Sequence, residues 1–272
     1  MGDRSELDRS SGLPERWPTP EYDDNDQPHF LFIITPPFSG STALSELINS
    51  SHGTMILQAR GEGQWLIPGM CETDRWNPDK SIDYESVKAV WLKTFQDKKK
   101  LNNLIQVVIE KSPPNMVRME ALAAQFRHVS FLASNRNPYA NCSSILFRNH
   151  PAEELSAEKR DGLIRSLAAS WIARSRKIEA LVQKLDIPLM TYEQFCDNPS
   201  LIKTKLHLPE AVTETIDPLA TVRVKDYPVQ PIANQNERQI AKLSNREIAS
   251  ISEQLEPHHK LLAFFGYKGL QP

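Results

Sequence analysis

The chain has 272 residues, 40% of them hydrophobic, and a formal net charge of −2 at pH 7. This length is enough to bury one large core, and a charge near zero gives no electrostatic reason to expect nucleic acid or an anionic membrane as a partner. The three cysteines are isolated in the sequence, so neither a disulfide framework nor a metal site is expected. We expect a polar, flexible segment over residues 1–28 and a single domain over residues 29–272. Since the first segment has no apolar run typical of a signal peptide or membrane span, the expected location is cytoplasmic.

The first predicted element is a buried strand over residues 30–34, where the sequence Phe-Leu-Phe-Ile-Ile is apolar and rich in aromatic and β-branched residues. A turn of small residues, Ser39-Gly40-Ser41-Thr42, follows and leads into a helical pattern from Ala43. This arrangement can bind phosphate, because the backbone N–H groups and the dipole of a helix N-terminus favour an anion. Glycine at position 40 permits close approach of the backbone. The turn lacks the lysine of a Walker A loop, and an ordinary strand–helix connection is the alternative interpretation.

Strand and helix patterns then alternate along the chain. Apolar residues at helical spacing predict helices over residues 84–97 and 118–126, and a long helix that begins near Leu163. Short apolar runs predict strands over residues 106–109, 128–134 and 187–191. Ser244 and Glu247 form a capping box that opens the penultimate helix. The alternation predicts an α/β fold with a central, mostly parallel sheet flanked by helices and a P-loop-like strand–loop–helix nucleotide site.

A second candidate for phosphate binding follows the strand over residues 128–134. Arg136 lies at the end of this strand, and Pro138 suits the first turn of the next helix. Ser144 is then about two turns into that helix. An arginine fork with a hydroxyl group suits a phosphate dianion, although each residue taken singly is better explained as an ordinary surface residue. Two such strand ends in one sheet favour phosphate binding.

Four segments of the chain together resemble the sulfotransferases that use 3′-phosphoadenosine 5′-phosphosulfate (PAPS). They occur in the order and at the approximate spacing found in that family, over roughly residues 29–267. The four segments are residues 37–42, Arg136-Asn137-Pro138 with Ser144, residues 190–195 followed by Asn198-Pro199, and a tail that contains Leu243-Ser244 and Phe265-Gly266-Tyr267.

The resemblance implies that PAPS is the donor, that 3′,5′-adenosine bisphosphate (PAP) is the product, and that no metal takes part. By this resemblance, the 5′-phosphosulfate would be held by Ser39, Gly40, Ser41, Thr42 and Ala43. The 3′-phosphate would be held by Arg136 and Ser144, and Tyr192, at a strand end, would contact the adenine. Lys225 would lie on a late loop over the 3′-phosphate.

The resemblance also implies a general base. Glu62, in Gly61-Glu62-Gly63, lies where the family often has the glutamate that deprotonates the acceptor hydroxyl. We expect the flanking glycines to allow close approach of the acceptor, and Trp65 to help desolvate the carboxylate.

A cation is needed on the leaving phosphate. Phe38 stands where most of these enzymes have a lysine or an arginine, and phenylalanine cannot stabilise the developing charge. Lys111 is the substitute that we expect, because Glu110-Lys111-Ser112-Pro113-Pro114 resembles the Glu-Lys-Thr-Pro segment of carbohydrate sulfotransferases.

The predicted function is the transfer of a sulfuryl group from PAPS to a hydroxyl of a small-molecule or carbohydrate acceptor by in-line displacement. Two alternatives stay open. A P-loop nucleoside kinase or phosphotransferase would need a Walker lysine and a magnesium-binding acid, neither of which is evident. A nucleotide-binding relative without catalysis is suggested by Phe38. The sequence identifies neither the acceptor nor the oligomeric state, and a homodimer stays open.

Overall fold

A computed structural model describes residues 27–224 and 227–271 of the chain. Within these residues there is one four-stranded sheet, in the order β2-β3-β1-β4, and all its neighbouring strands run parallel. The strands are β1 (His29–Ile34), β2 (Thr54–Ile56), β3 (Val107–Glu110) and β4 (His128–Ala133). The parallel sheet with helices on both faces confirms the predicted α/β class, and β1, β3 and β4 confirm three of the predicted strands.

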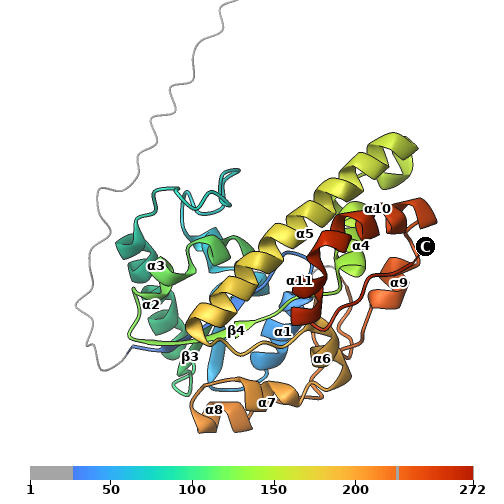
Figure 1. The fold of residues 1–272 in the computed structure, drawn as a ribbon. Coiled ribbons are helices and arrows are strands. Elements are labelled where there is room, and N and C mark those ends of the chain that lie inside the picture. Colours follow the sequence, from blue (N-terminus) through green and yellow to red (C-terminus); the bar gives the residue numbers. More distant parts are fainter. Residues whose placement is uncertain (1–26, 225–226, 272) are drawn as a thin grey trace, which may run out of the picture.

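Helices surround this sheet, and the longest, α5, has 29 residues. Helices α4, α10 and α11 pack along it, as Figure 1 shows. The helices are α1 (Ser41–Ile48), α2 (Tyr84–Lys99), α3 (Met119–Ala123), α4 (Pro138–Asn149), α5 (Ala157–Leu185), α6 (Tyr192–Asp197), α7 (Leu201–Lys205), α8 (Glu210–Glu214), α9 (Asn236–Ile240), α10 (Asn245–Leu255) and α11 (His259–Phe264). Short 3-10 turns are η2 (Ala59–Gly61), η3 (Gly63–Leu66), η4 (Pro113–Val117), η5 (Ala152–Glu154) and η6 (Glu256–His258).

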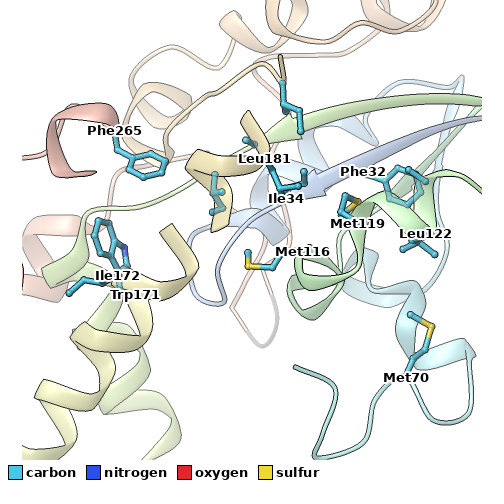
Figure 2. Close-up of a cluster of buried hydrophobic side chains, with 14 of the residues drawn as sticks. Phe32, Ile34, Met70, Met116, Met119, Leu122, Trp171, Ile172, Leu181 and Phe265 are labelled. Carbon is cyan, nitrogen blue, oxygen red and sulfur yellow. The ribbon is translucent and has the colours of Figure 1, made fainter. Parts of the chain in front are cut away.

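The core lies on both faces of the sheet, as expected for a parallel sheet. Successive side chains of β1 point to opposite faces, so Phe30, Phe32 and Ile34 enter one cluster, which includes residues of α2, α3 and α5. Leu31 and Ile33 enter the other cluster, which includes residues of α1, α6 and α7. Figure 2 shows part of the first cluster, in which Trp171 of α5 lies beside Phe265, with ring centroids 6.3 Å apart.

Several predicted boundaries were wrong. The predicted strand over residues 187–191 is reduced to a single bridge between Leu189 and Ala133. The predicted helix over residues 118–126 is shorter, since only α3 is α-helical there. The long helix begins at Ala157 rather than near Leu163, because Ser156 caps it by accepting a hydrogen bond from the backbone N–H of Lys159. The capping box of Ser244 and Glu247 is confirmed at the start of α10.

The predicted N-terminal segment falls mostly on residues 1–26, which lie outside the described residues, so the division at residue 28 stays a prediction. Cys71, Cys142 and Cys196 are free thiols. Across the two described ranges, no helix combines the length and the apolar character that crossing a membrane requires.

Candidate functional site

A cavity of about 470 Å³ lies at the carboxyl ends of β1, β3 and β4. The sequence analysis placed candidate site residues in the segments that follow these three strands, and residues from all three segments line this one cavity. Among the residues that line it are Gly40, Ser41, Thr42, Ala43, Glu62, Lys111, Arg136, Ser144 and Tyr192. The late-loop candidate Lys225 lies outside the described residues.

The connection from β1 to α1 has the geometry of an anion site. Gly40 precedes the helix in the left-handed region, with φ of 79°, and no side chain in the described part of the chain caps α1. A Cβ atom at this glycine would lie 2.3 Å from Cδ2 of Tyr192, so the tyrosine ring packs directly on the turn. The first backbone N–H groups of α1, which have no intrahelical acceptor, are therefore left for a ligand at the cavity.

Asn141 of α4 fixes this turn from behind. Its side-chain amide donates to the carbonyl oxygen of Pro37 at 2.8 Å and to Oγ of Ser39 at 3.2 Å. Ser39 is buried and lies behind the cavity wall instead of lining it. The sequence did not identify Asn141, because its two partners are more than a hundred residues away.

Arg136 occupies the position predicted for it, at the end of β4. Its Nη1 donates to the carbonyl oxygen of Phe38 at 3.1 Å and to Oγ of Ser144 at 3.3 Å. Its Nε donates to Oδ1 of Asn236 at 2.8 Å, and the guanidinium lies 4.3 Å from the ring centroid of Tyr192. The residue is only 6% exposed, yet Nη2 has no hydrogen-bond partner among the described residues. One donor of this arginine is therefore not used by any described residue, which is rare for a buried polar group.

Tyr192 lies at the cavity, but not at a strand end as predicted. It is the first residue of α6, because Thr191 and Gln194 form a capping box that starts a helix there. Its hydroxyl donates to the carbonyl oxygen of Ala233 at 3.1 Å and accepts from the backbone N–H of Gln235 at 3.1 Å. Burial raises the pKa of this hydroxyl, which therefore stays protonated. The ring and its hydroxyl tie α6 to the segment before α9.

Glu193 is a residue that sequence reasoning did not place in the site. Its Oε1 accepts from the backbone N–H of Asn137 at 2.9 Å and from Nδ2 of Asn236 at 2.6 Å. Its Oε2 accepts from the hydroxyl of Tyr267 at 2.9 Å. The carboxylate of Glu193 thus connects three parts of the chain: Asn137, Asn236 and Tyr267. Asn236 in turn binds Arg136.

Lys111 and Glu62 form a largely buried ion pair at the cavity. Nζ of Lys111, whose side chain is 1% exposed, lies 3.2 Å from Oε1 of Glu62 and 3.5 Å from Oγ1 of Thr42. Oε2 of Glu62 accepts from Nε2 of Gln64 at 2.8 Å and from Nε1 of Trp65 at 3.1 Å. Burial raises the pKa of Glu62, but the charge of Lys111 and these hydrogen bonds outweigh it, so the net shift is downward. The carboxylate is therefore ionised near neutral pH, as a general base must be.

Trp65, which we expected to help desolvate Glu62, contacts its carboxylate directly. Its side chain is 52% exposed, and its indole N–H donates a hydrogen bond to the carboxylate of Glu62. This bond favours the charged form of the carboxylate, so it acts on the pKa in the direction opposite to desolvation.

The glycines beside Glu62 are needed for packing within the protein. The backbone N–H of Lys111 donates to the carbonyl oxygen of Gly61 at 2.7 Å, and the N–H of Gly63 donates to Oε2 of Glu110 at 2.7 Å. A Cβ atom on Gly63 would lie only 2.5 Å from that same carboxylate oxygen and 2.7 Å from Cδ1 of Leu57. At Gly63, then, the space that we expected the acceptor to use is filled by protein atoms.

The wall of the cavity is strongly cationic. Besides Lys111 and Arg136 it contains Arg75, Arg148, Arg238 and Lys242, and its one acidic residue within the described ranges is Glu62. The net charge of the whole chain is only −2, so the positive charge is concentrated at this cavity, where it favours an anionic ligand. In the portion that the structure describes, no cluster of three or more His, Cys, Asp or Glu side chains could hold a metal ion.

No protein-family model matches the chain, and no curated protein matches its sequence. Solved structures do resemble it. The sulfotransferase STF9 from Mycobacterium avium has a TM-score of 0.52 at 12% identity, over 92% of this chain and 80% of that one. A sulfotransferase from Alicyclobacillus acidocaldarius has a TM-score of 0.50 at 12% identity, over 89% of this chain and 97% of that one. At these identities the likeness concerns the fold.

Proposed function

We propose that this chain, which has the fold of the sulfotransferases, transfers a sulfuryl group from PAPS to a hydroxyl of a small-molecule or carbohydrate acceptor. The observation that carries the proposal is the ion pair between Lys111 and Glu62, whose nitrogen and oxygen are 3.2 Å apart. This pair puts a cation beside Thr42 at the N-terminus of α1 and an ionised carboxylate at the wall of the same cavity.

The residues present fit PAPS as the donor, because its two phosphate-bearing positions need two separate groups of donors. The uncapped N-terminus of α1 with Thr42 suits the 5′-phosphosulfate. Arg136 with Ser144 suits the 3′-phosphate, because a guanidinium and a hydroxyl can both donate to phosphate oxygens. The surrounding cations on α4, α9 and the segment before α10 add attraction for a polyanion.

In this proposal PAPS supplies a sulfuryl group already bonded to a phosphate, which is a good leaving group. Glu62 accepts the proton of the acceptor hydroxyl as the new bond to sulfur forms. Lys111 stabilises the negative charge that develops on the departing phosphate, and the N–H groups of α1 hold the same region. Because Lys111 and Glu62 converge, they support a catalytic site over a relative that only binds the nucleotide.

The first test is a thermal melt of the protein with PAP, with 5′-AMP and Mg-ATP as controls. A ligand that binds only the folded state at a hundredfold over its Kd stabilises it by about 2.7 kcal/mol. We expect PAP to raise the Tm and 5′-AMP to raise it much less, because 5′-AMP lacks the phosphate for Arg136. A shift with Mg-ATP alone would favour a kinase, and no shift with any of the three would contradict the proposal.

The proposed base is tested by Glu62→Gln, with Glu153→Gln as an exposed control. We expect the kcat of sulfuryl transfer to fall by about 10²–10⁴-fold, the usual contribution of a general base, while the Kd for PAP stays nearly constant. Equal losses in turnover and in PAP affinity would remove Glu62 from the role of base.

A further inference from the structure

The segment that carries Glu62 is fixed to the end of β3 on both sides of this residue. Before it, the carbonyl oxygen of Gly61 accepts from the backbone N–H of Lys111 at 2.7 Å. After it, the N–H of Gly63 donates to Oε2 of Glu110 at 2.7 Å. Lys111 directly follows Glu110 in the chain, so two neighbouring residues hold the backbone on either side of Glu62. These contacts set the distance of 3.2 Å between the carboxylate of Glu62 and Nζ of Lys111.

The backbone before Glu62 needs such support. Arg60 has φ of 70° and Gly61 has φ of 76°, so two successive residues lie in the left-handed region. A residue other than glycine is strained there, and this conformation persists only where surrounding contacts hold it.

The contact after Glu62 depends on one particular side chain. Lys111 binds Gly61 through its backbone, whereas the bond to Gly63 needs the carboxyl group of Glu110. Glu110 is 1% exposed and does not line the cavity, so it does not touch a ligand there. Its Oε1 accepts from Nδ2 of Asn115 at 2.9 Å, which fixes the orientation of the carboxyl group.

We propose that Glu110 is a positioning residue for the proposed base: by holding the N–H of Gly63, its carboxyl group keeps the carboxylate of Glu62 against Lys111. This inference rests on the proposed function. Glu110 itself takes no part in proton transfer. Without its contact, the segment after Glu62 loses an anchor, and Glu62 moves away from Lys111.

Such a movement changes the pKa of Glu62. Burial raises this pKa, and the charge of Lys111 leads the effects that lower it and decide the net shift. A greater separation from Lys111 therefore raises the pKa of Glu62. The indole N–H of Trp65 donates to Oε2 of Glu62 at 3.1 Å, so its NMR signal reports the ionisation of this carboxylate without any substrate.

The test follows the indole ¹H–¹⁵N signal of Trp65 against pH in the full chain. Trp65→Phe identifies this signal among those of the five tryptophans. In the wild type we expect an inflection below pH 4.5, because the net shift of the pKa of Glu62 is downward. Burial raises the pKa of Glu110 to about 7, so Glu110 is uncharged in this pH range. A change caused by replacing Glu110 then reflects its contact with Gly63 and not a lost charge.

Four variants separate this contact from general destabilisation. Glu110→Leu removes the acceptor for Gly63, and Glu110→Asp is one methylene too short to reach it, so both should move the inflection to higher pH. In Glu110→Gln the amide oxygen can accept from Gly63, and the wild-type inflection should return. Glu247→Ala removes a buried carboxylate at the start of α10, away from the cavity, and should leave the inflection unchanged. The Kd for PAP, measured by calorimetry, should stay within about twofold of the wild type in all four.

The outcomes distinguish the positioning role from the proposed function. An unchanged inflection in Glu110→Leu, or in Glu110→Asp should the leucine variant not fold, would overturn the positioning role. An equal shift in Glu110→Gln or Glu247→Ala would also overturn it, and so would a wild-type Trp65 signal without an inflection. A parallel loss of PAP affinity would show that Glu110 supports the whole cavity and does not act on Glu62 in particular. If the wild type does not bind PAP, the proposed function fails, whatever the signal of Trp65 shows.

Discussion

The buried carboxyl group of Glu110 makes the stability of this protein depend on pH. The side chain lies at the end of β3, is 1% exposed, and accepts from the N–H of Gly63 at 2.7 Å and from Nδ2 of Asn115 at 2.9 Å. Burial raises its pKa from 4.5 to about 7, against the opposing effects of its hydrogen bonds and of Lys111. The folded protein therefore holds a proton on this group at pH values where the unfolded chain has lost it.

The free energy at stake follows from that shift. Between pH 4.5 and about 7 the folded state binds more protons than the unfolded state, so the free energy of unfolding falls as the pH rises. A shift of about 2.5 units at 1.36 kcal/mol per unit corresponds to about 3 kcal/mol. This contribution is fully present below pH 4.5 and is lost as the pH passes through the folded pKa.

Glu110→Gln removes this titration and keeps the shape of the side chain. The new amide oxygen can accept from Gly63, and its NH₂ group can donate to Oδ1 of Asn115, which has no partner within the described residues, once the Asn115 amide turns over. We expect the free energy of unfolding of the wild type to fall between pH 4.5 and about 8, and that of the variant to show no such fall. The difference, variant minus wild type, should therefore increase by about 3 kcal/mol from the low end of this range to the high end.

Urea unfolding at several pH values in that range measures the difference directly. Glu153→Gln, an exposed carboxyl, serves as the control and should follow the wild type. Parallel stability curves for wild type and Glu110→Gln, or a difference that grows as the pH falls, would refute the reasoning.

Two further predictions concern Gly63 and Arg136. Gly63→Ala should destabilise the protein by about 1–3 kcal/mol, because the new Cβ would lie 2.5 Å from Oε2 of Glu110. Gly162→Ala, in α5, should instead stabilise the protein by about 0.5–1 kcal/mol, because no described atom beyond its chain neighbours and the backbone of its own helix comes within 4 Å of the new Cβ. Equal effects of the two changes on denaturant unfolding would contradict both predictions. Arg136→Lys should weaken PAP binding by about 1–3 kcal/mol, because a lysine cannot keep the contacts to Asn236 and Ser144 and also donate to a ligand. Calorimetry measures the Kd, and a value within twofold of the wild type would be evidence that Arg136 does not bind the 3′-phosphate.

Features encoded within one short segment could be predicted from the sequence. The apolar run over residues 30–34 predicted the strand β1, and the turn of small residues after it predicted that a helix, α1, would follow. The spacing of eight residues between Arg136 and Ser144 placed the two side chains on consecutive structural elements, and their atoms do meet, at 3.3 Å. Here a strand end, a proline and one helix determine the geometry without help from the rest of the chain.

Features that depend on distant partners could not be predicted. Arg136 binds Asn236 across 100 residues of sequence, and Gly63 binds Glu110 across 47. No local pattern specifies such pairs, which exist only once the fold has formed. The error at Tyr192 is of a different kind, since Thr191 and Gln194 already carry the sequence of a capping box and so predict a helix start.

The arrangement of β1 and β3 explains how the cavity has a cation although position 38 is phenylalanine. The strands are parallel neighbours, and Phe32 pairs with Glu110, so Lys111 follows directly after β3, level with the last residues of β1. Its Nζ therefore reaches Thr42. Phe38 contributes its backbone instead: it has a positive φ of 62°, and its carbonyl oxygen accepts from Arg136. In this chain β3 carries a cation to the cavity beside the β1–α1 turn, because parallel strands bring their carboxyl ends to one edge of the sheet.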